Sequence, residues 1–258
     1  MEGRIHVGTS GYVYGHWRGV LYPAGLSSIR WLPRYAEAFS TVELNNTFYR
    51  LPETATVSRW RSSTPADFVF CCKGSRYLTH IKRLNDARTG LNRFYGRVRY
   101  LGSKLRLVLW QLPPTLKPDH GRLESFLKAQ PRDIRQAVEF RNALWYTKET
   151  CEVLERHGAA FCEHDHFRER PPELTGGWRY LGFHGKTGRY RGRYGSEGLA
   201  PYARGLKHWR KRGRDAYVYF NNDVHGDAVF DALALLRLLG QPSPLGLEND
   251  PELSGARR

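Results

Sequence analysis

Short apolar segments alternate with segments of helical spacing along most of the chain, and this alternation constrains the fold more than any other feature. Seven segments carry apolar residues three or four positions apart, which predicts helices; they are Ser28–Phe39, Thr54–Arg61, Asp86–Tyr100, Asp119–Gln130, Thr147–His157, Leu199–Arg212 and Asp227–Leu239. Eight segments have the length and apolar character of β-strands; they are Ile5–Gly8, Val42–Tyr49, Phe68–Cys72, Leu105–Gln111, Gln136–Arg141, Ala160–Glu163, Arg179–Phe183 and Ala216–Phe220. Strands that alternate with helices predict a parallel sheet. Eight such units in about 240 residues predict an α/β protein with a (β/α)8 TIM-like barrel, and an open doubly wound sheet of similar size is the alternative.

The composition sets the expected domain organisation and location. No break in composition divides the chain, so we expect a single barrel domain over residues 1–240. The tail, residues 241–258, is rich in proline, glycine and charge, which predicts poor order. No stretch approaches the ~20 apolar residues that span a bilayer, and the N-terminus lacks a signal-peptide core. We therefore expect a cytoplasmic protein without a membrane partner, whose four cysteines are small buried thiols.

The positive charge is large and unevenly placed. The formal net charge is +16. Residues 73–106 hold ten Lys or Arg and one acid, and residues 179–214 hold eleven and one acid. Such clustering favours a phosphate-containing ligand or a nucleic acid as partner. The alternative is a solvated surface in an arginine-rich proteome.

Polar side chains stand at the end of every predicted strand. In a barrel, the C-terminal strand ends meet at one mouth, where sites form. Glu43 and Asn45 would share a strand face, as would Glu139 and Arg141. We expect catalytic groups in Glu43, Glu139, Asp165 and His184. We expect substrate-binding groups in Asn45, Tyr49, Lys73, Gln111, Arg141, Trp145, Arg189, Tyr190 and Asn221. The alternative for each residue is that loops are polar, and that Trp145 packs within a loop.

Several longer motifs resemble a known family. The chain is similar to the YecE-like family, a domain of unknown function with a TIM-barrel-like fold. The resemblance runs through GTSGYVYGHWRGVLYP (8–23), VELNNTFYRLP (42–52), FCCKGSRYLTHIKRL (70–84), WQLPP (110–114), AVEFRNALWY (137–146), FHGKTGRYRGRY (183–194) and YFNNDVHGDAV (219–229). It implies the barrel, whereas activity is implied only by analogy with metal-dependent endonuclease and sugar-isomerase barrels. Gly182 stands where the family often has Arg before Phe-His-Gly, so Arg189 or Arg191 would have to replace an anion-binding Arg.

The first function class is a hydrolase that acts on a phosphate-containing or nucleic-acid substrate. The loop GRYRGRY (188–194) interleaves basic and aromatic residues, as backbone contacts and base stacking require. A divalent metal is compatible with Glu43, Glu139, His164, Asp165, His166 and His184 at the strand ends. The sequence nevertheless has no HExxH motif, and H-x-H at 164–166 stands alone. The identity of any metal or cofactor is therefore left unknown.

Two other function classes fit the same residues. Glu43 and Glu139 could flank a polar substrate in a metal-free glycosidase-like or isomerase-like enzyme. The charge fits equally a non-catalytic nucleic-acid-binding protein. The sequence sets neither the substrate nor the oligomeric state.

Overall fold

The computed structural model describes residues 2–167, 169–188 and 190–241. Within them the strands are β1 Ile5–Thr9, β2 Thr41–Leu44, β3 Val69–Lys73, β4 Leu105–Leu112, β5 Arg135–Phe140, β6 Ala160–Phe161, β7 Glu163–His164, β8 Arg179–Phe183 and β9 Ala216–Phe220. The α-helices are α1 Trp31–Ala38, α2 Asn46–Tyr49, α3 Thr54–Ser62, α4 Ala87–Val98, α5 His120–Lys128, α6 Lys148–Arg156, α7 Gly195–Lys211 and α8 Asp227–Leu239. The predicted tail from 241 onward lies outside the described residues except for Gln241.

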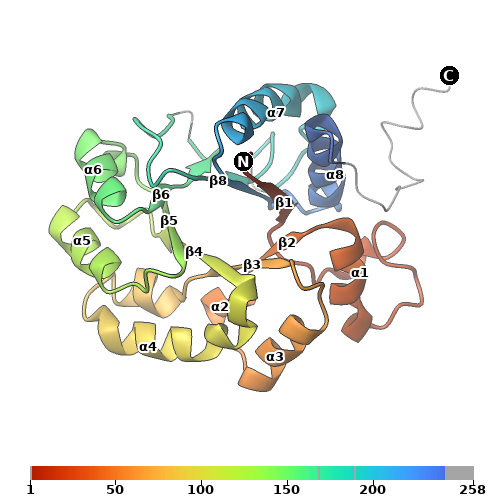
Figure 1. Ribbon diagram of the computed structural model, residues 1–258, viewed down its shortest axis with the longest axis horizontal. Helices are drawn as coiled ribbons and strands as arrows, with labels where there is room; N and C mark the ends of the chain where they lie inside the picture. The colour runs from red at the N-terminus through yellow and green to blue at the C-terminus, as the bar shows by residue number, and fades with distance from the viewer. Residues whose placement is uncertain (1, 168, 189, 242–258) are drawn as a thin grey trace. The chain divides into compact units, whose positions relative to one another are not determined.

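The strands form two parallel sheets. One has the order β2-β3-β4-β5-β6 (Figure 1) and the other has the order β1-β9-β8-β7. Register pairs such as Ile5 with Ala216, and Gln111 with Glu139, run parallel. The predicted α/β class, with strands and helices in the order of a (β/α)8 protein, is confirmed. The predicted strand at 160–163 is two short strands on either side of Cys162.

The described chain divides into two compact units. The first comprises residues 2–42, 63–68 and 183–241, and the second comprises residues 43–62, 69–167 and 169–182. The boundaries fall inside β2 and β8, which therefore contribute residues to both units. The single domain over residues 1–240 stays a prediction.

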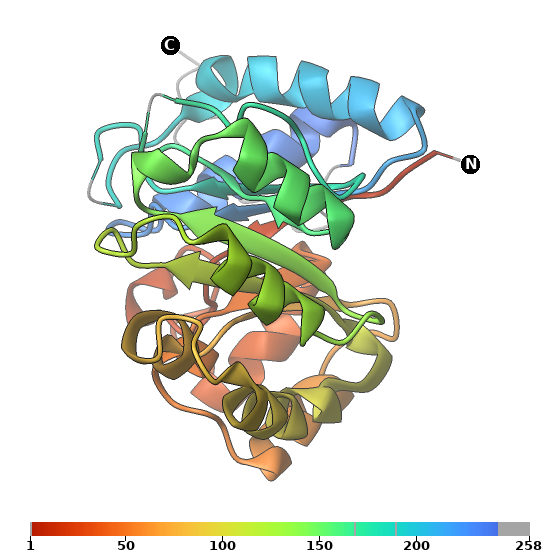
Figure 2. The same cartoon turned by 90° about the vertical axis from the view of Figure 1, so that its left-hand side faces the viewer.

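Helices cover the sheet of the second unit. Helices α4, α5 and α6 lie along one face of β3–β6, and α5 and α6 pack against each other (Figures 1 and 2). Strand β3 is buried at every position, as expected when the faces of a parallel sheet are covered. In the first unit, α7 packs on α8, and α8 packs on β1 and β9.

Two predicted helix starts have a clear physical cause. The Asp119 side chain accepts a hydrogen bond from the backbone N–H of Arg122 at 2.9 Å, which caps α5. The Thr147 hydroxyl accepts from the backbone N–H of Thr150 at 3.2 Å, which caps α6. Among the described residues, no helix is both long and apolar enough to cross a membrane.

The predicted strand 42–49 is wrong beyond Leu44. Asn45 has helical backbone angles, φ −78° and ψ −26°, and precedes α2. The Thr47 hydroxyl donates to the Leu44 carbonyl at 2.8 Å and lies 2.7 Å from the Lys73 carbonyl, which holds the turn against β3. Asn45 therefore does not share a strand face with Glu43.

Candidate functional site

Glu43 lies buried on β2 and is bound by a tyrosine from β8. Its side chain is 3% exposed, and its Oε2 accepts a hydrogen bond from the Tyr180 hydroxyl. The Tyr180 hydroxyl also lies 3.7 Å from the Cys71 sulfur. Since a buried carboxylate is costly without hydrogen bonds, Tyr180 is part of what keeps Glu43 in the sheet.

The cysteines beside Glu43 are inert thiols. Burial raises the pKa of Cys71 and Cys72, and the negative charge of Glu43 raises both further. The pKa of Cys162, between β6 and β7, is raised first by burial and then by the charges of Glu139 and Glu43. The prediction of buried thiols is confirmed, because all four cysteines are free and buried.

Glu139 and Arg141 meet at the end of β5, as their spacing predicted. The Arg141 Nε donates a hydrogen bond to the Glu139 Oε1, and the Glu139 side chain is almost wholly buried. Arg141 follows the last residue of β5, so its guanidinium reaches back to the carboxylate. The contact brings a guanidinium and a carboxylate together at the end of β5.

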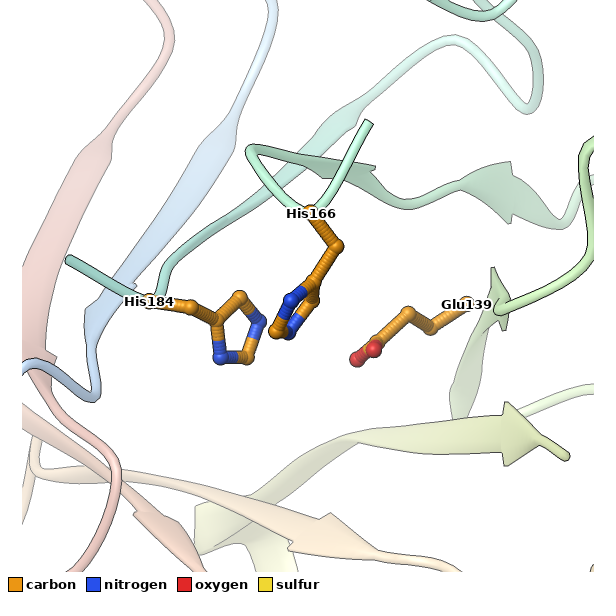
Figure 3. A group of neighbouring side chains, drawn as sticks. All are labelled: Glu139, His166 and His184. Carbon is orange, nitrogen blue, oxygen red and sulfur yellow. The ribbon is translucent and has the colours of Figure 1, made fainter. Parts of the chain in front are cut away.

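His166 lies beside Glu139. A ring nitrogen of His166 and a carboxylate oxygen of Glu139 lie within 4.8 Å of each other, and the two side chains point into the same space (Figure 3). Burial lowers the pKa of His166 to about 4, and the positive charge of Arg141 adds to the effect. His166 is therefore a neutral imidazole at physiological pH, which can accept a proton or bind a metal ion.

The two histidines of the H-x-H motif have different roles. His164 Nε2 lies 2.9 Å from the Phe140 carbonyl, and its Nδ1 lies 3.3 Å from the backbone N–H of His166. These contacts require a proton on Nε2 and none on Nδ1, which fixes one neutral tautomer. Since β7 ends at His164, strand alternation does not continue to His166. His164 thus positions the loop that carries His166.

Lys73 ends β3 as a nearly buried cation. Its side chain is 9% exposed, and its Nζ lies 5.3 Å from the centroid of the Phe48 ring. Among the described residues, no ion pair involves Lys73, as the salt bridges of the second unit lie elsewhere. His80 packs its ring on Phe48 at 5.1 Å; burial lowers the pKa of His80, and the charges of Arg76 and Lys73 lower it further.

The other predicted residues of the second unit are spread more widely. Gln111 of β4 stands opposite Glu139 in the sheet register. Asp165 is half-buried in the turn after β7. Tyr49 is exposed on α2. Trp145 is buried, donates to the Leu116 carbonyl at 2.8 Å and stacks on Phe140. These contacts match the alternative considered for Trp145, in which the ring packs inside the protein.

The first unit holds a smaller group of predicted residues. His184 is buried after β8, its Nδ1 lies 3.4 Å from the Asn221 side-chain nitrogen, and its ring lies 5.7 Å from the Tyr190 ring. Tyr190 has a left-handed backbone, φ 64°. Arg189 lies outside the described residues.

Sequence reasoning missed a histidine–carboxylate pair in the first unit. His16 Nε2 lies 2.9 Å from Asp223 Oδ2, and the Trp17 indole donates to Asp223 Oδ1 at 2.7 Å. Burial raises the pKa of Asp223 to about 6, against the opposing effect of the Trp17 and His16 bonds. Each residue follows a strand, Asp223 a predicted one and His16 β1, and this position was the available signal. The pair was missed because 207 positions separate the two residues.

Comparison with known proteins places the chain in one family. The family model described as "Protein of unknown function DUF72" matches residues 6–253. UPF0759 protein YunF of Bacillus subtilis (strain 168) is 26% identical over 253 residues, which cover 85% of this chain and 90% of YunF. UPF0759 protein YecE of Escherichia coli (strain K12) is 33% identical over 118 residues, which cover 45% of this chain and 43% of YecE.

Solved structures of the same family resemble this chain. A DUF72 family protein from Thermotoga maritima MSB8 superposes with a TM-score of 0.82 at 30% identity, over 92% of this chain and 99% of that one. A DUF72 family protein from Enterococcus faecalis V583 shares the fold, with a TM-score of 0.75 at 19% identity over 92% and 95% of the two chains. The predicted resemblance is therefore confirmed, and the chain belongs to the DUF72 family of proteins of unknown function.

Proposed function

We propose that the protein binds a phosphate-containing substrate at the ends of β3 and β5 and hydrolyses it. The observation that carries the proposal is Lys73, a nearly buried ammonium group without an ion pair among the described residues. A buried charge is costly unless an opposite charge compensates it. A phosphate oxyanion at Lys73 would supply that compensation.

Arg141 and His166 support the same proposal. The Arg141 Nε donates to Glu139, and a guanidinium carries five N–H donors, which is the group through which arginine binds phosphate. Arg141 and Lys73 both act electrostatically on His166, so the two cations lie near one imidazole. The second unit thus offers two cations for the phosphate and, in Glu139 and His166, two groups for proton transfer.

The proposed reaction is hydrolysis of a phosphate ester. The water oxygen attacks phosphorus, and the bond between phosphorus and the ester oxygen breaks. The water proton passes to Glu139 or His166, and the departing alkoxide takes a proton from solvent. Lys73 and Arg141 stabilise the negative charge that concentrates on the phosphoryl oxygens.

The donor set also allows a divalent ion. The carboxylate oxygen of Glu139 and the imidazole nitrogen of His166 are suitable ligands for Zn²⁺ or Mn²⁺, and lie within 4.8 Å of each other. A bound ion would polarise a phosphoryl oxygen or lower the pKa of a water. In the proposal, Glu139 and His166 orient the water whether or not an ion is present.

The test compares Lys73→Met with Lys128→Met. Lys128 is an exposed residue at the end of α5, so its removal controls for the loss of one charge. Wild type is assayed on p-nitrophenyl phosphate and bis-p-nitrophenyl phosphate, with EDTA and with added Mg²⁺, Mn²⁺ or Zn²⁺. We expect Lys73→Met to lose at least about 100-fold in kcat/KM, consistent with removal of a main transition-state charge contact.

The melting temperature shows whether a variant loses activity because it loses its fold. Lys73→Met removes a buried charge that has no acidic partner among the described residues, so its Tm should equal or exceed that of wild type. Lys128→Met should keep wild-type activity and wild-type Tm. Turnover by Lys73→Met at the wild-type rate, or no turnover by wild type under any of these conditions, would overturn the proposal.

A further inference from the structure

A cavity of about 410 Å³ opens beside the candidate site, within the second unit. Its walls come from the segment that follows α2, from the π-helix η3 (Tyr77–Ile81) with the residues on either side of it, and from the first half of α4. We call it the aromatic–basic groove; it is lined by Leu51, Ser75, Tyr77, Lys82, Asp86, Thr89, Gly90 and Arg93. A volume of this size is within the range of small-ligand sites.

Aromatic and apolar side chains are exposed at this groove. Tyr77 is 48% exposed and lines the cavity, and Ile81 of the same π-helix is also exposed. Gly90 lets α4 pack closely on the π-helix, because a Cβ there would meet the Leu78 Cδ2 at 2.5 Å and the Tyr77 Cε1 at 3.6 Å. An exposed aromatic ring that lines a cavity is suited to stacking on a planar ligand.

The groove is strongly basic. Lys82 and Arg93 line it, and Arg76 stands next to Tyr77 in the chain and is exposed. The acidic residue in the lining, Asp86, has its Oδ2 3.7 Å from the Lys82 Nζ, but the Asp86 side chain is largely exposed. Residues 73–106 hold ten Lys or Arg and no other acid, so the local field favours a polyanion rather than a neutral aromatic ligand.

The groove wall has a fixed and unusual backbone. Arg83, Leu84 and Asp86 adopt left-handed angles, with φ of 50°, 70° and 45°. Non-glycine residues are strained in this region, so packing elsewhere must hold them. Leu84 does so here, since its side chain is buried and its N–H donates to the Leu78 carbonyl at 2.9 Å. The wall is therefore preorganised.

A chain of ring contacts connects the π-helix at the groove with Lys73. His80 belongs to the same π-helix as Tyr77, and its ring packs on Phe48 at 5.1 Å. The Phe48 ring in turn contacts the Lys73 ammonium at 5.3 Å. A ligand with a base in the groove and a phosphate at Lys73 would thus extend from the π-helix to the end of β3.

We propose that the aromatic–basic groove binds one unpaired base of a single-stranded nucleic acid, with Tyr77 stacked on the base and Arg93 on the backbone. The inference deepens the proposed function, on which it rests for the phosphate at Lys73. A base that fills a cavity beside an exposed ring must be unstacked from its neighbours, so a duplex fits less well.

The test is fluorescence anisotropy with fluorescein-labelled 12-nucleotide probes of mixed sequence, as single-stranded DNA, single-stranded RNA and the DNA duplex. Tyr77→Ala and Arg93→Gln are compared with Tyr100→Ala and Arg106→Gln. Both control residues are exposed, in the same unit and outside the groove. We expect Tyr77→Ala to weaken single-strand affinity by about 5- to 100-fold, in line with the loss of one base stack. Arg93→Gln should reduce the salt dependence of binding by about one phosphate contact.

Each outcome decides the inference. Controls that bind like wild type, and a duplex bound at least about 10-fold more weakly than the single strands, would support it. Wild-type affinity in Tyr77→Ala, tighter binding of the duplex, or no binding of any probe at low salt would overturn it. Failure of the proposed function shows instead as absent ester turnover by wild type, so the two failures are distinguishable. The DNA and RNA arms identify the sugar that the site accepts.

Discussion

Replacing Tyr180 by Phe removes a single hydroxyl that donates to a buried carboxylate, and it should destabilise the protein strongly. Glu43 is 3% exposed and accepts this hydrogen bond on Oε2. A hydrogen bond to a charged group contributes about 1.5–3 kcal/mol, and an acceptor left buried without its donor loses that amount or more. The Cys71 sulfur lies 3.7 Å from the Tyr180 hydroxyl, and a thiol is only a weak hydrogen-bond donor.

The expected loss is therefore about 2–3 kcal/mol in the free energy of unfolding. In a protein of this size 1 kcal/mol corresponds to about 2–4 °C in Tm, so Tyr180→Phe should melt about 5–10 °C below wild type. Calorimetry at pH 7 measures this shift directly. In a Glu43→Gln background the same change removes a neutral hydrogen bond, so it should cost only about 1 kcal/mol. The double-mutant cycle then gives a coupling energy of about 1–2 kcal/mol.

Tyr100→Phe is the matched control. Its ring is 50% exposed, and removal of its hydroxyl should change Tm by less than about 2 °C. If Tyr180→Phe has the same Tm as this control, the Tyr180 hydroxyl does not stabilise the buried Glu43 when the protein is in solution. Equal costs of Tyr180→Phe in the wild-type and Glu43→Gln backgrounds would likewise show that the carboxylate charge is not involved.

Three further predictions follow from the packing and the titrating groups. Gly74→Ala should cost at least about 2 kcal/mol, or prevent folding, because the new Cβ would lie 2.1 Å from the Trp110 ring; urea unfolding measures the cost. His166 should titrate near pH 4 by NMR, and Arg141→Gln should raise that pKa because it removes a cation that lowers it. The Asp223 carboxyl should titrate near pH 6 by ¹³C NMR. Its pKa lies above the ordinary 3.8, so its contribution to stability is complete below about pH 4 and is lost as the pH rises through about 6.

Each of these has a control within the chain. Gly96 lies exposed in α4, and a Cβ added there would meet no atom within 4 Å, so Gly96→Ala should stabilise the protein by about 0.5–1 kcal/mol. A loss equal to that of Gly74→Ala would contradict the packing argument. His166 should keep its pKa in Arg106→Gln, and a midpoint near the ordinary 6.5 in wild type would contradict its burial. His16→Ala should raise the Asp223 pKa above about 6, since His16 lowers it, and a fall would contradict the assignment.

Local pattern predicted the parts of the structure that depend on neighbours in sequence. The βα order follows from apolar spacing, and the Glu139–Arg141 contact follows from residues two apart at a strand end. Trp145 shows the limit of the same reasoning, because an aromatic residue after a strand can stack on a ligand or on its own core. It packs on Phe140, since its indole N–H finds the Leu116 carbonyl.

Contacts between distant residues could not be predicted from pattern. Asn45 leaves the strand because Thr47 bonds to a carbonyl of β3, 26 positions away. His164 and His166 have different roles because His164 bonds to a carbonyl on β5. The tyrosine that donates to Glu43 lies 137 residues away, and nothing in either local sequence marks the pair. Each case is decided by hydrogen bonds that exist only once the strands are assembled.

The pairing of β1 with β9 has a consequence for synthesis on the ribosome. Ile5 pairs with Ala216, so about 210 residues must be added before the first strand meets its partner. At ~5–20 residues per second that interval is roughly 10–40 s. The second unit, by contrast, is complete once residue 182 has emerged. The edge of β1 that pairs with β9 must therefore stay unpaired while later parts of the chain are made. A chaperone that binds nascent chains would find an unpaired strand edge at β1.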